Sequence, residues 1–403
     1  MRILVLTTKS PYPLYEGRAL RTYNLLRQVA KRHEVLLFTF VQTQEEREGL
    51  DHLRTFCAHV EGIPLHLGAG KWRIVVDMLR EFFGAAPLHA VKYRSSAMRG
   101  RVRAMLDSGT IDLVHLDMLH LGDYLDLCAG KPVVLVEHNI ESTLLRRRVE
   151  NTSNPLAKLY LYYQYLKLKS YESRVCRRVS QVVTVSELDA RALQHLAGIS
   201  GVNPISNGVD TSYFRAMGVP RRPNSLVFVG GLTWFPNYDA IRYFCAEILP
   251  LVAAEVADVS LTVVGKNPEQ RGVREIAENP RVRLAGLVDD VRPYISEASA
   301  YVVPLRIGGG TRLKILDALS MGMPLVSTSI GCEGLDVVSG EHLLIADTPQ
   351  ELAREIVRVL RNPDLGWRLG AAGRELVEQK YEWSVIAQGL DDVYQRCLTA
   401  AAA

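Results

Sequence analysis

Residues 301–317 read YVVPLRIGGGTRLKILD: an apolar run, three glycines and the start of an amphipathic segment. Glycine has no Cβ atom, so Gly308, Gly309 and Gly310 let the backbone turn sharply and bring N–H groups close to a ligand. Thr311 is placed to cap a helix that the apolar periodicity after it predicts, and the positive end of that helix faces the same space. A plain strand-to-helix turn is the alternative, but the residues that follow favour a phosphate-binding loop.

Two charged residues follow the glycines at helical spacing. Lys314 lies one turn into the predicted helix, where an ammonium group can reach a second phosphate. Asp317 lies a further turn along, where its carboxylate can accept hydrogen bonds from sugar or ribose hydroxyls.

Length and composition describe a globular protein with more than one domain. A chain of 403 residues exceeds what one hydrophobic core normally fills, so two domains are expected. The hydrophobic content of 48% and the charged content of 23% are typical of a soluble protein. The net charge of +4 is too small to indicate nucleic acid as the main partner, and it permits an anionic small ligand or an anionic membrane surface.

Cysteines and apolar runs indicate the compartment. The six cysteines are scattered, with no C-x-x-C pair and no histidine at zinc-finger spacing, so we expect reduced thiols in a cytoplasmic protein. The short apolar run in residues 1–7, MRILVLT, has no cleavage site after it and predicts a first strand, not a signal peptide. No apolar stretch reaches the roughly 20 residues of a membrane span, so any membrane contact is expected to be peripheral, at the inner face.

The first half of the chain alternates short apolar runs with helical periodicity. A helix is predicted at residues 18–32, and strands are predicted at residues 3–6, 34–40, 113–116, 133–136, 181–185 and 201–205. This alternation predicts right-handed βαβ units and a parallel sheet, with ligands at the carboxyl ends of the strands.

The second half repeats the pattern after a break. Between residues 206 and 224 the apolar pattern lapses into Asn, Gly, Asp and Pro, which predicts a linker. Strands are then predicted at residues 225–229, 260–264, 282–284, 300–303, 324–327 and 342–345, and helices at about 237–249, 349–360, 364–379 and 383–398. We therefore expect an α/β fold with doubly wound domains at residues 1–206 and 207–382, and a ligand held in the cleft between them.

Polar residues follow several predicted strands. Gly230 and Gly231 end the strand at 225–229, so the backbone can approach a ligand there, and Thr233 or Asn237 could donate hydrogen bonds. The alternative is a tight turn with Trp234 and Phe235 in the core. In the first half, Glu137, His138 and Asn139 follow a buried strand, and His138 suits the orientation of a hydroxyl or the movement of a proton, although a structural hydrogen bond is the other reading. His115 and Asp117 are weaker candidates of the same type.

Several ligand classes lose support. The loop at residues 8–17 ends in Gly17, which permits close approach of a diphosphate or sugar at a helix N-terminus, but it lacks the dinucleotide fingerprint G-x-G-x-x-G. No segment matches the P-loop pattern, so NAD enzymes and P-loop ATPases are not indicated. The chain contains no D-x-D, so a carboxylate-held metal is not expected.

A basic and aromatic stretch covers residues 144–148 and 156–171 and includes five tyrosines. The favoured interpretation is a surface helix whose apolar stripe packs on its own domain. The alternative is docking at an anionic membrane where a lipid-linked acceptor is held.

Together these motifs resemble the retaining glycosyltransferases of family 4, and the likeness spans nearly the whole chain. It rests on EGR at residues 16–18, EHN at 137–139, VSE at 185–187, SNGVD at 206–210, FVGG at 228–231 and the segment from 308 to 324. The nearest subgroup is similar to bacterial exopolysaccharide glycosyltransferases, with a Gly-Gly-x-x-Trp-x-Pro-Asn segment like residues 230–237. The resemblance implies the GT-B architecture, with two Rossmann-like domains, and a last helix at residues 383–398 that packs onto the first domain.

This chain departs from the family pattern at two places. The family's Glu-x7-Glu motif aligns its second acid with Asp317 but its first with Gly309, so a backbone N–H replaces a carboxylate there. The Arg and Lys that often neutralise the diphosphate after the first strand of the second domain are absent. Lys314 then carries more of that charge, with Arg312 as a helper.

The resemblance implies transfer of a hexose-like sugar from a nucleoside diphosphate to a hydroxyl acceptor, with retention and without a metal or other cofactor. Amides of residues 308–311, the helix dipole and Lys314 stabilise the leaving diphosphate, and His138 orients the sugar. Gly17 and Arg18 join the donor-binding set. The acceptor, a glycan, a lipid-linked compound or a small molecule, carries no readable code. A GT-B nucleotide-sugar epimerase and a non-catalytic nucleotide-sugar binder remain as alternatives.

Overall fold

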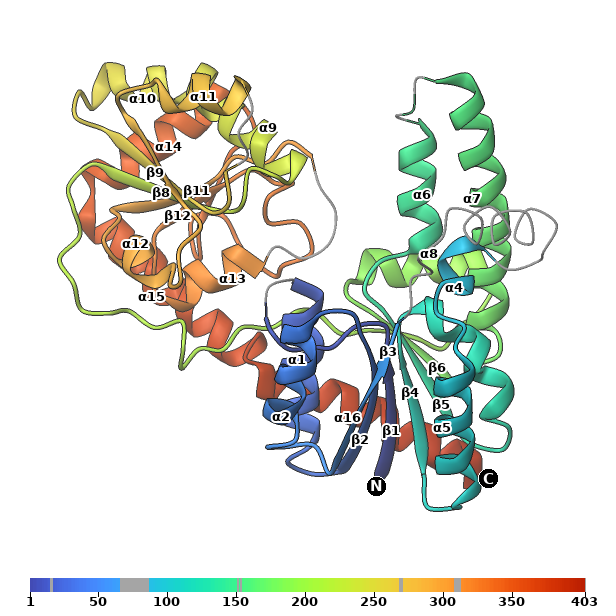
Figure 1. The fold of residues 1–403 in the computed structure, drawn as a ribbon. Helices are drawn as coiled ribbons and strands as arrows, with labels where there is room; N and C mark the ends of the chain where they lie inside the picture. Colours follow the sequence, from blue (N-terminus) through green and yellow to red (C-terminus); the bar gives the residue numbers. More distant parts are fainter. Residues whose placement is uncertain are drawn as a thin grey trace. The chain divides into compact units, whose positions relative to one another are not determined.

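The computed structural model describes residues 1–14, 17–65, 87–150, 152, 154–267, 271–307 and 313–402. The chain divides into two compact units, and each is an α/β structure (Figure 1). Unit 1 contains Met1–Ser206 together with Ile386–Ala403, and unit 2 contains Asn207–Val385.

Unit 1 is built on seven parallel strands in the order β3-β2-β1-β4-β5-β6-β7. The strands are β1 (Arg2–Thr7), β2 (Glu34–Val41), β3 (His59–Pro64), β4 (Leu113–Asp117), β5 (Val133–Glu137), β6 (Gln181–Thr184) and β7 (Val202–Pro204). All but β3 agree with the predicted positions. The sequence of β3, HVEGIP, mixes a glutamate and a glycine with its apolar residues and ends in proline, so its pattern did not stand out.

Eight α-helices are described in unit 1. They are α1 (Gly17–Val29), α2 (Gln44–Leu53), α4 (Leu88–Val91), α5 (Ser96–Asp107), α6 (Glu141–Glu150), α7 (Pro155–Cys176), α8 (Glu187–Ala197) and α16 (Trp383–Ala402). A 3-10 helix, Leu119–Leu127, follows β4. From Ile386 onward α16 belongs to unit 1, where Asp391 pairs with Arg32 at 2.8 Å and Arg396 donates to Asn203 at 2.7 Å.

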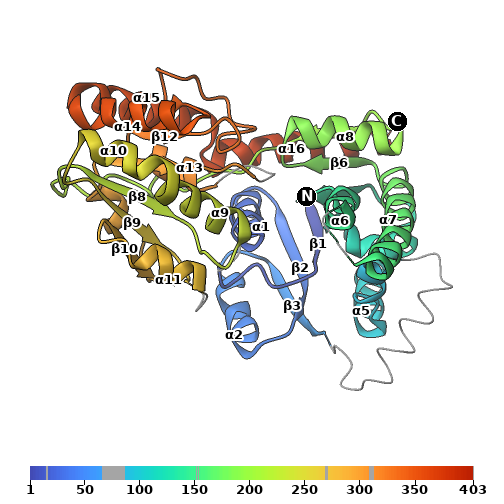
Figure 2. The same ribbon diagram turned by 90° about the horizontal axis from the view of Figure 1, so that it is seen from above.

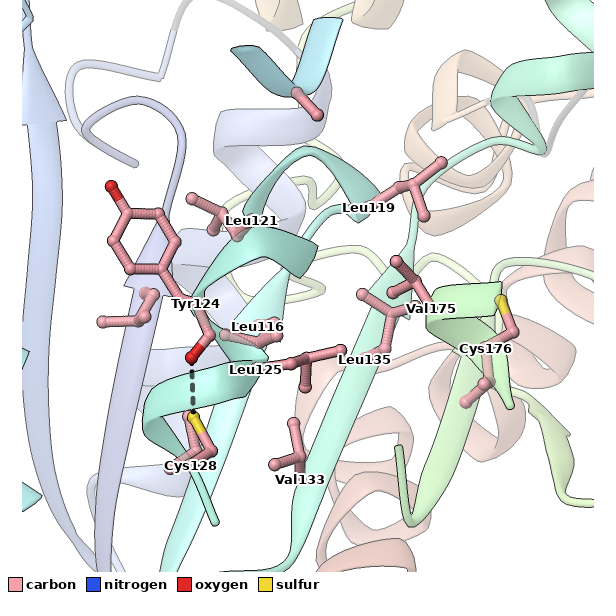
Figure 3. Close-up of a cluster of buried hydrophobic side chains, with 14 of the residues drawn as sticks. Leu116, Leu119, Leu121, Tyr124, Leu125, Cys128, Val133, Leu135, Val175 and Cys176 are labelled. Atoms are coloured by element: carbon pink, nitrogen blue, oxygen red, sulfur yellow. Dashed lines mark hydrogen bonds between the residues drawn. The ribbon is translucent and has the colours of Figure 1, made fainter. Parts of the chain in front are cut away.

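The core of unit 1 forms where the apolar faces of these elements meet the sheet. Figure 3 shows one part of it, where Leu116 of β4 and Leu135 of β5 lie among side chains of the 3-10 helix and of α7. Cys128, the residue after the 3-10 helix, donates a hydrogen bond from its thiol to the Tyr124 carbonyl oxygen, 3.4 Å long. Each of these residues is buried, so the side of the sheet under the 3-10 helix is closed by apolar packing.

Unit 2 has six parallel strands in the order β10-β9-β8-β11-β12-β13. They are β8 (Ser225–Val229), β9 (Ser260–Val264), β10 (Val282–Gly286), β11 (Ala300–Val303), β12 (Leu325–Ser327) and β13 (Leu344–Ile345), and all lie where the sequence predicts them. The predicted fold class of two α/β domains with parallel sheets is confirmed.

The helices described in unit 2 connect and cover these strands. They are α9 (Phe235–Tyr243), α10 (Leu249–Glu255), α11 (Arg271–Ala277), α12 (Arg292–Ser296), α13 (Leu313–Ser320), α14 (Pro349–Arg361) and α15 (Pro363–Lys380). A π-helical turn, Phe244–Ile248, joins α9 to α10, so the helix predicted at about 237–249 begins two residues earlier and continues to Glu255. α10 and α14 lie side by side (Figure 2).

Candidate active site

The strand order of each sheet predicts where a ligand binds. In unit 2 the chain runs from β8 to β9 and β10 on one side and then returns to β11 on the other side of β8. Ligands of open parallel sheets bind at the carboxyl ends of the strands where the strand order reverses, so a ligand of unit 2 is expected beside the ends of β8 and β11. In unit 1 the strand order reverses in the same way between β1 and β4, because β2 and β3 lie on one side of β1 and β4 lies on the other.

The turn after β8 is held close to the turn after β9. The N–H of Gly230 donates to the Val264 carbonyl oxygen at 2.8 Å, and the N–H of Leu232 donates to Lys266 at 2.9 Å. A Cβ atom on Gly265 would lie 2.6 Å from backbone atoms of Gly230 and Gly231. Glycine at position 265 thus allows the two strand ends to approach this closely.

Trp234 and Phe235 are not core residues. They are 67% and 61% exposed, so the alternative that reads this segment as a tight turn with two aromatic residues in the core is wrong. Thr233 is also exposed, and its hydroxyl lies 3.5 Å from the position of a Cβ atom on Gly231. Thr233, Trp234 and Phe235 therefore present their side chains outward, whereas Leu232 before them packs in the core.

Lys314 of α13 reaches the start of α9, beside the carboxyl end of β8. Its ammonium donates to the Asn237 side-chain oxygen at 2.8 Å and lies 4.1 Å from the centre of the Phe228 ring. Asn237 donates in turn to the Gly231 carbonyl oxygen at 3.0 Å. A Cβ atom on Gly230 would lie 2.6 Å from the ammonium, so this glycine leaves the space that Lys314 occupies. The structure thus brings together Gly230, Gly231, Asn237 and Lys314.

Asp317 lies one turn beyond Lys314 on α13 and is half-buried. Burial raises the pKa of Asp317 to about 8, although the charge of Lys314 opposes the shift. At neutral pH much of this carboxyl group is therefore protonated. A protonated carboxyl donates one hydrogen bond, whereas the sequence pattern suggested only an acceptor.

The remaining part of the predicted phosphate loop, Gly308, Gly309, Gly310, Thr311 and Arg312, lies outside the described residues. The structure describes the chain again from Leu313, where α13 begins.

Unit 1 carries a second polar cluster, at the point where its own strand order reverses. Asp117 ends β4 and is buried; it accepts a hydrogen bond from the Thr22 hydroxyl at 2.8 Å. His138, which follows β5, places Nε2 2.8 Å from the other Asp117 oxygen. His115 Nε2 lies 3.8 Å from the same oxygen, and His115 Nδ1 shares a 2.6 Å hydrogen bond with the Tyr394 hydroxyl.

The charge of Asp117 is stabilised by this cluster. Burial alone would raise its pKa, but the charges and hydrogen bonds of His138 and His115 outweigh burial and hold the pKa of Asp117 well below its usual range. A permanent carboxylate at 2.8 Å fixes the orientation of the His138 ring. His115 and Asp117, the weaker candidates, thus lie in one network with His138. Thr22 and Tyr394 were missed, since no local pattern links them to residues far away in the chain.

The loop after β1 lies beside this cluster. Thr8, Lys9, Arg18, Thr22 and Asp117 line a small cavity between this loop and α1. Gly17 is the first residue of α1, and the Arg18 guanidinium donates to the Met118 sulfur at 3.0 Å. The two predicted residues of this loop therefore lie at the carboxyl edge of the sheet of unit 1.

Glu137 is the last residue of β5, and its side chain does not reach the surface. Its side chain is buried, and burial, together with the charges of Glu172 and Glu141, raises the pKa of Glu137 well above its ordinary value. It therefore lies beneath the site as a neutral side chain, while Asn139 is exposed.

Comparison with known proteins places both halves of the chain in one group of enzymes. Residues 16–213 match the family described as "Glycosyltransferase Family 4", and residues 223–362 match the family described as "Glycosyl transferases group 1". The phosphatidyl-myo-inositol mannosyltransferase of Mycobacterium leprae is 28% identical over 322 residues, which cover 76% of this chain and 79% of that protein. An uncharacterized 44.6 kDa protein of the cps region of Klebsiella pneumoniae is 21% identical over 369 residues, 90% of this chain and 91% of that protein.

Solved structures show the same fold along the whole chain. HepE of Anabaena, solved in complex with UDP, has a TM-score of 0.68 at 15% identity and covers 98% of this chain and 100% of its own. Sucrose-phosphate synthase of Thermosynechococcus elongatus has a TM-score of 0.70 at 17% identity, with 99% and 100% covered. These neighbours have the GT-B fold, and the sequence families span more than half of the residues. This chain is a member of the family 4, group 1 glycosyltransferases with the GT-B fold.

Proposed function

We propose that this chain is a retaining glycosyltransferase that moves a sugar from a nucleoside diphosphate sugar to a hydroxyl acceptor, without a metal, in bacterial glycan or glycoconjugate synthesis. One observation carries the proposal. Lys314 lies at the strand reversal of unit 2, bonded to Asn237 and enclosed by Gly230, where an ammonium group can meet a diphosphate. The complexes of HepE with UDP and with UDP-glucose support this type of donor.

The donor side of the proposed reaction is electrostatic. As the bond between the anomeric carbon and the diphosphate oxygen breaks, negative charge grows on the leaving group, and Lys314 stabilises it. Gly230 and Gly231 allow the backbone to approach the diphosphate, and Asn237 keeps the ammonium in position. The glycines 308–310, Thr311 and Arg312 are assigned the same role from the sequence. Asp317 and Thr233 contact the sugar or ribose hydroxyls.

On the acceptor side of the proposed reaction, a hydroxyl of the acceptor replaces the diphosphate at the anomeric carbon. The acceptor oxygen forms its bond to the anomeric carbon on the face that the leaving group vacates, and its proton passes to the departing phosphate oxygen. His138 orients the sugar, and the Asp117 carboxylate holds the His138 ring. No protein nucleophile is required for this route, so the two-step displacement of other retaining enzymes is not invoked.

A thermal-shift screen of nucleotides tests the donor assignment. UDP, GDP and ADP, and their sugar conjugates, are added to the full chain and to Lys314→Ala. One diphosphate should raise the melting temperature of the wild type, because a ligand at about 100 times its Kd adds about 2.7 kcal/mol. Lys314→Ala should weaken that nucleotide by roughly 10- to 100-fold, since a hydrogen bond to a charged group contributes about 1.5–3 kcal/mol.

Lys380→Ala is the matched control. Lys380 is an exposed lysine of unit 2 that pairs only at the surface with Asp336, so its loss should leave the nucleotide response unchanged. An equal response of Lys314→Ala and the wild type contradicts the proposed diphosphate site. Donor that is interconverted to another sugar without any acceptor indicates an epimerase instead, and donor binding without turnover indicates a binding protein.

A further inference from the structure

α6 and α7 form a helical hairpin in unit 1 whose base is anchored and whose outer part is not. Figure 1 shows the two helices side by side, extending beyond the carboxyl edge of the sheet. The second half of α7 packs into the core through Leu168, Tyr171 and Val175. Glu172 of α7 accepts the backbone N–H of Glu141 at 2.8 Å and so ties down the start of α6. The outer part, residues 144–150 and 154–169, is called the hairpin tip below.

The hairpin tip exposes a stripe of large apolar side chains. Leu156 is 80% exposed and Leu159 is 68% exposed, and Tyr162 and Leu166 are also exposed. Steps of three, three and four residues place all four on one face of α7. The favoured sequence interpretation, in which this stripe packs on its own domain, is wrong for these four residues, whereas Leu161 and Tyr165 of the same helix do pack against the core of unit 1. Single exposed leucines are ordinary, but a continuous exposed face indicates a partner.

The same surface has a large net positive charge for its size. The hairpin tip contains one acidic residue, Glu150, and six basic residues, Arg146, Arg147, Arg148, Lys158, Lys167 and Lys169. Its net charge is therefore +5, whereas the whole chain has a net charge of +4. Lys158 and Lys169 border the apolar stripe on one side and Lys167 borders it on the other, by their positions on the helix.

The apolar stripe and the net positive charge together indicate what kind of partner binds the hairpin tip. A second copy of the hairpin tip would bring two surfaces of charge +5 together, which costs free energy by repulsion. An anionic lipid surface satisfies both features, because its headgroups attract the lysines and arginines and its acyl boundary accepts the apolar stripe. The described helices include none that is long and apolar enough to cross a bilayer, which leaves a surface contact.

We propose that the hairpin tip docks on an anionic membrane surface, with Leu156, Leu159 and Leu166 inserted at the boundary between headgroups and acyl chains. Tyr162 lies on the same face, where an aromatic ring with a polar end suits the interface. The docking surface belongs to unit 1 alone, and it does not depend on the sugar donor proposed above. Its failure and the failure of the donor assignment are therefore separate results.

Vesicle co-sedimentation of the full chain tests this surface. The vesicles contain phosphatidylcholine alone or mixed with phosphatidylglycerol. The wild type should pellet with the mixed vesicles, stay in solution with phosphatidylcholine alone, and dissociate as salt rises. Leu156→Ser combined with Leu159→Ser should lower the partition coefficient at least about ten-fold, because burying each leucine contributes on the order of 1.5–3 kcal/mol.

Matched variants separate docking from general surface effects. Leu287→Ser is the apolar control, since Leu287 is 81% exposed in unit 2, and it should bind like the wild type. Lys158→Glu with Lys169→Glu should abolish the preference for phosphatidylglycerol, whereas Lys31→Glu, an exposed lysine after α1, should preserve it. Circular dichroism checks that each variant is folded.

Three outcomes overturn the proposal. The first is a wild type that does not bind mixed vesicles. The second is binding that the double leucine variant retains in full. The third is a concentration-dependent dimer, seen by analytical ultracentrifugation, that the double leucine variant loses, because the hairpin tip is then an interface between two copies of the chain.

Discussion

Glu172 is a fully buried carboxyl group at the base of the α6–α7 hairpin. Burial raises the pKa of Glu172 to about 7, although hydrogen bonds from Ser142 and from the Glu141 backbone oppose the shift. Burial likewise raises the pKa of Glu141 to about 7. With Glu137, whose pKa is also raised, three carboxyl groups in one region hold protons at a pH where an unfolded chain has released them.

The stability of the chain should therefore fall as pH rises. Between about pH 4.5, the ordinary value, and about pH 7, the folded state binds protons that the unfolded state has lost, so the free energy of unfolding falls by about 1.4 kcal/mol per pH unit for each such proton. Glu172→Gln should flatten this slope, because glutamine keeps one acceptor oxygen and does not titrate. Urea unfolding across this pH range measures the slope. Glu375→Gln, on the exposed side of α15, should leave it as in the wild type, and a slope in Glu172→Gln at least as steep as that of the wild type argues against the raised pKa.

Strands β8 and β9 end in two turns that position the proposed donor site together. Gly265 packs against Gly230 and Gly231 with no room for a side chain, and its φ of +145° is one that side chains rarely adopt. α9 starts from the first of these turns and carries Asn237, which holds Lys314. The position of the ammonium therefore depends on how closely the two strand ends meet.

Gly265→Ala should damage both stability and nucleotide binding. Its Cβ atom would lie 2.6 Å from the backbone of Gly230, so the turn has to shift, at a cost of about 1–3 kcal/mol. The nucleotide that stabilises the wild type should then give a smaller thermal shift. Gly100→Ala is the control, because a Cβ atom on this glycine of α5 meets nothing within 4 Å, and it should raise stability by up to about 1 kcal/mol. A Gly265→Ala protein with full stability and binding would show that the turns move independently.

The chain passes from one unit to the other twice, after Ser206 and after Val385. Residues beside these two points make contacts within their own unit. In unit 1 the buried Arg21 guanidinium donates to the carbonyl oxygens of Ser206 at 2.6 Å and Ile205 at 2.7 Å. In unit 2 the Val209 N–H donates to Tyr381 at 2.8 Å, and the ring of Trp383 lies against Gly208. The segments on either side of these points are therefore fixed by contacts between residues far apart in the sequence, which no local sequence pattern predicts.

Gly208→Ala tests how much these contacts contribute. A Cβ atom at this position would lie 2.8 Å from the Trp383 ring and 2.8 Å from the Tyr381 carbonyl oxygen, and the buried ring has little room to move. We expect a loss of about 1–3 kcal/mol in the free energy of unfolding, measured by denaturant titration. Gly389→Ala in α16, whose Cβ atom would meet only Ile205 at an ordinary 3.9 Å, should cost much less. Equal effects of the two variants would mean that the Trp383 packing is not rigid.

The elements of this protein follow from its local patterns. Apolar runs at β1, β4, β8 and β11 mark strands, and the helical periodicity after residue 312 marks α13, because period and burial are properties of one segment at a time. The same patterns singled out Lys314, Asp317 and His138 from their places beside strand ends. Among the strands the exception is β3. Its mixed composition gives no apolar run, although Gly62 in the middle of this strand is packed against Leu50 and Val41.

Contacts between residues that are distant in the sequence were decided by the tertiary structure. Lys314 and Asn237 meet because β11 lies beside β8 in the sheet, and Thr22, Asp117 and His138 meet because β4 lies between β1 and β5. Exposure was decided in the same way: Trp234 and Leu156 have apolar side chains, which are more often found in a core, yet none of the described elements covers them. Periodicity shows which face of a segment is apolar, whereas the order of the strands and the reach of the surrounding helices determine what that face and its neighbouring polar groups contact.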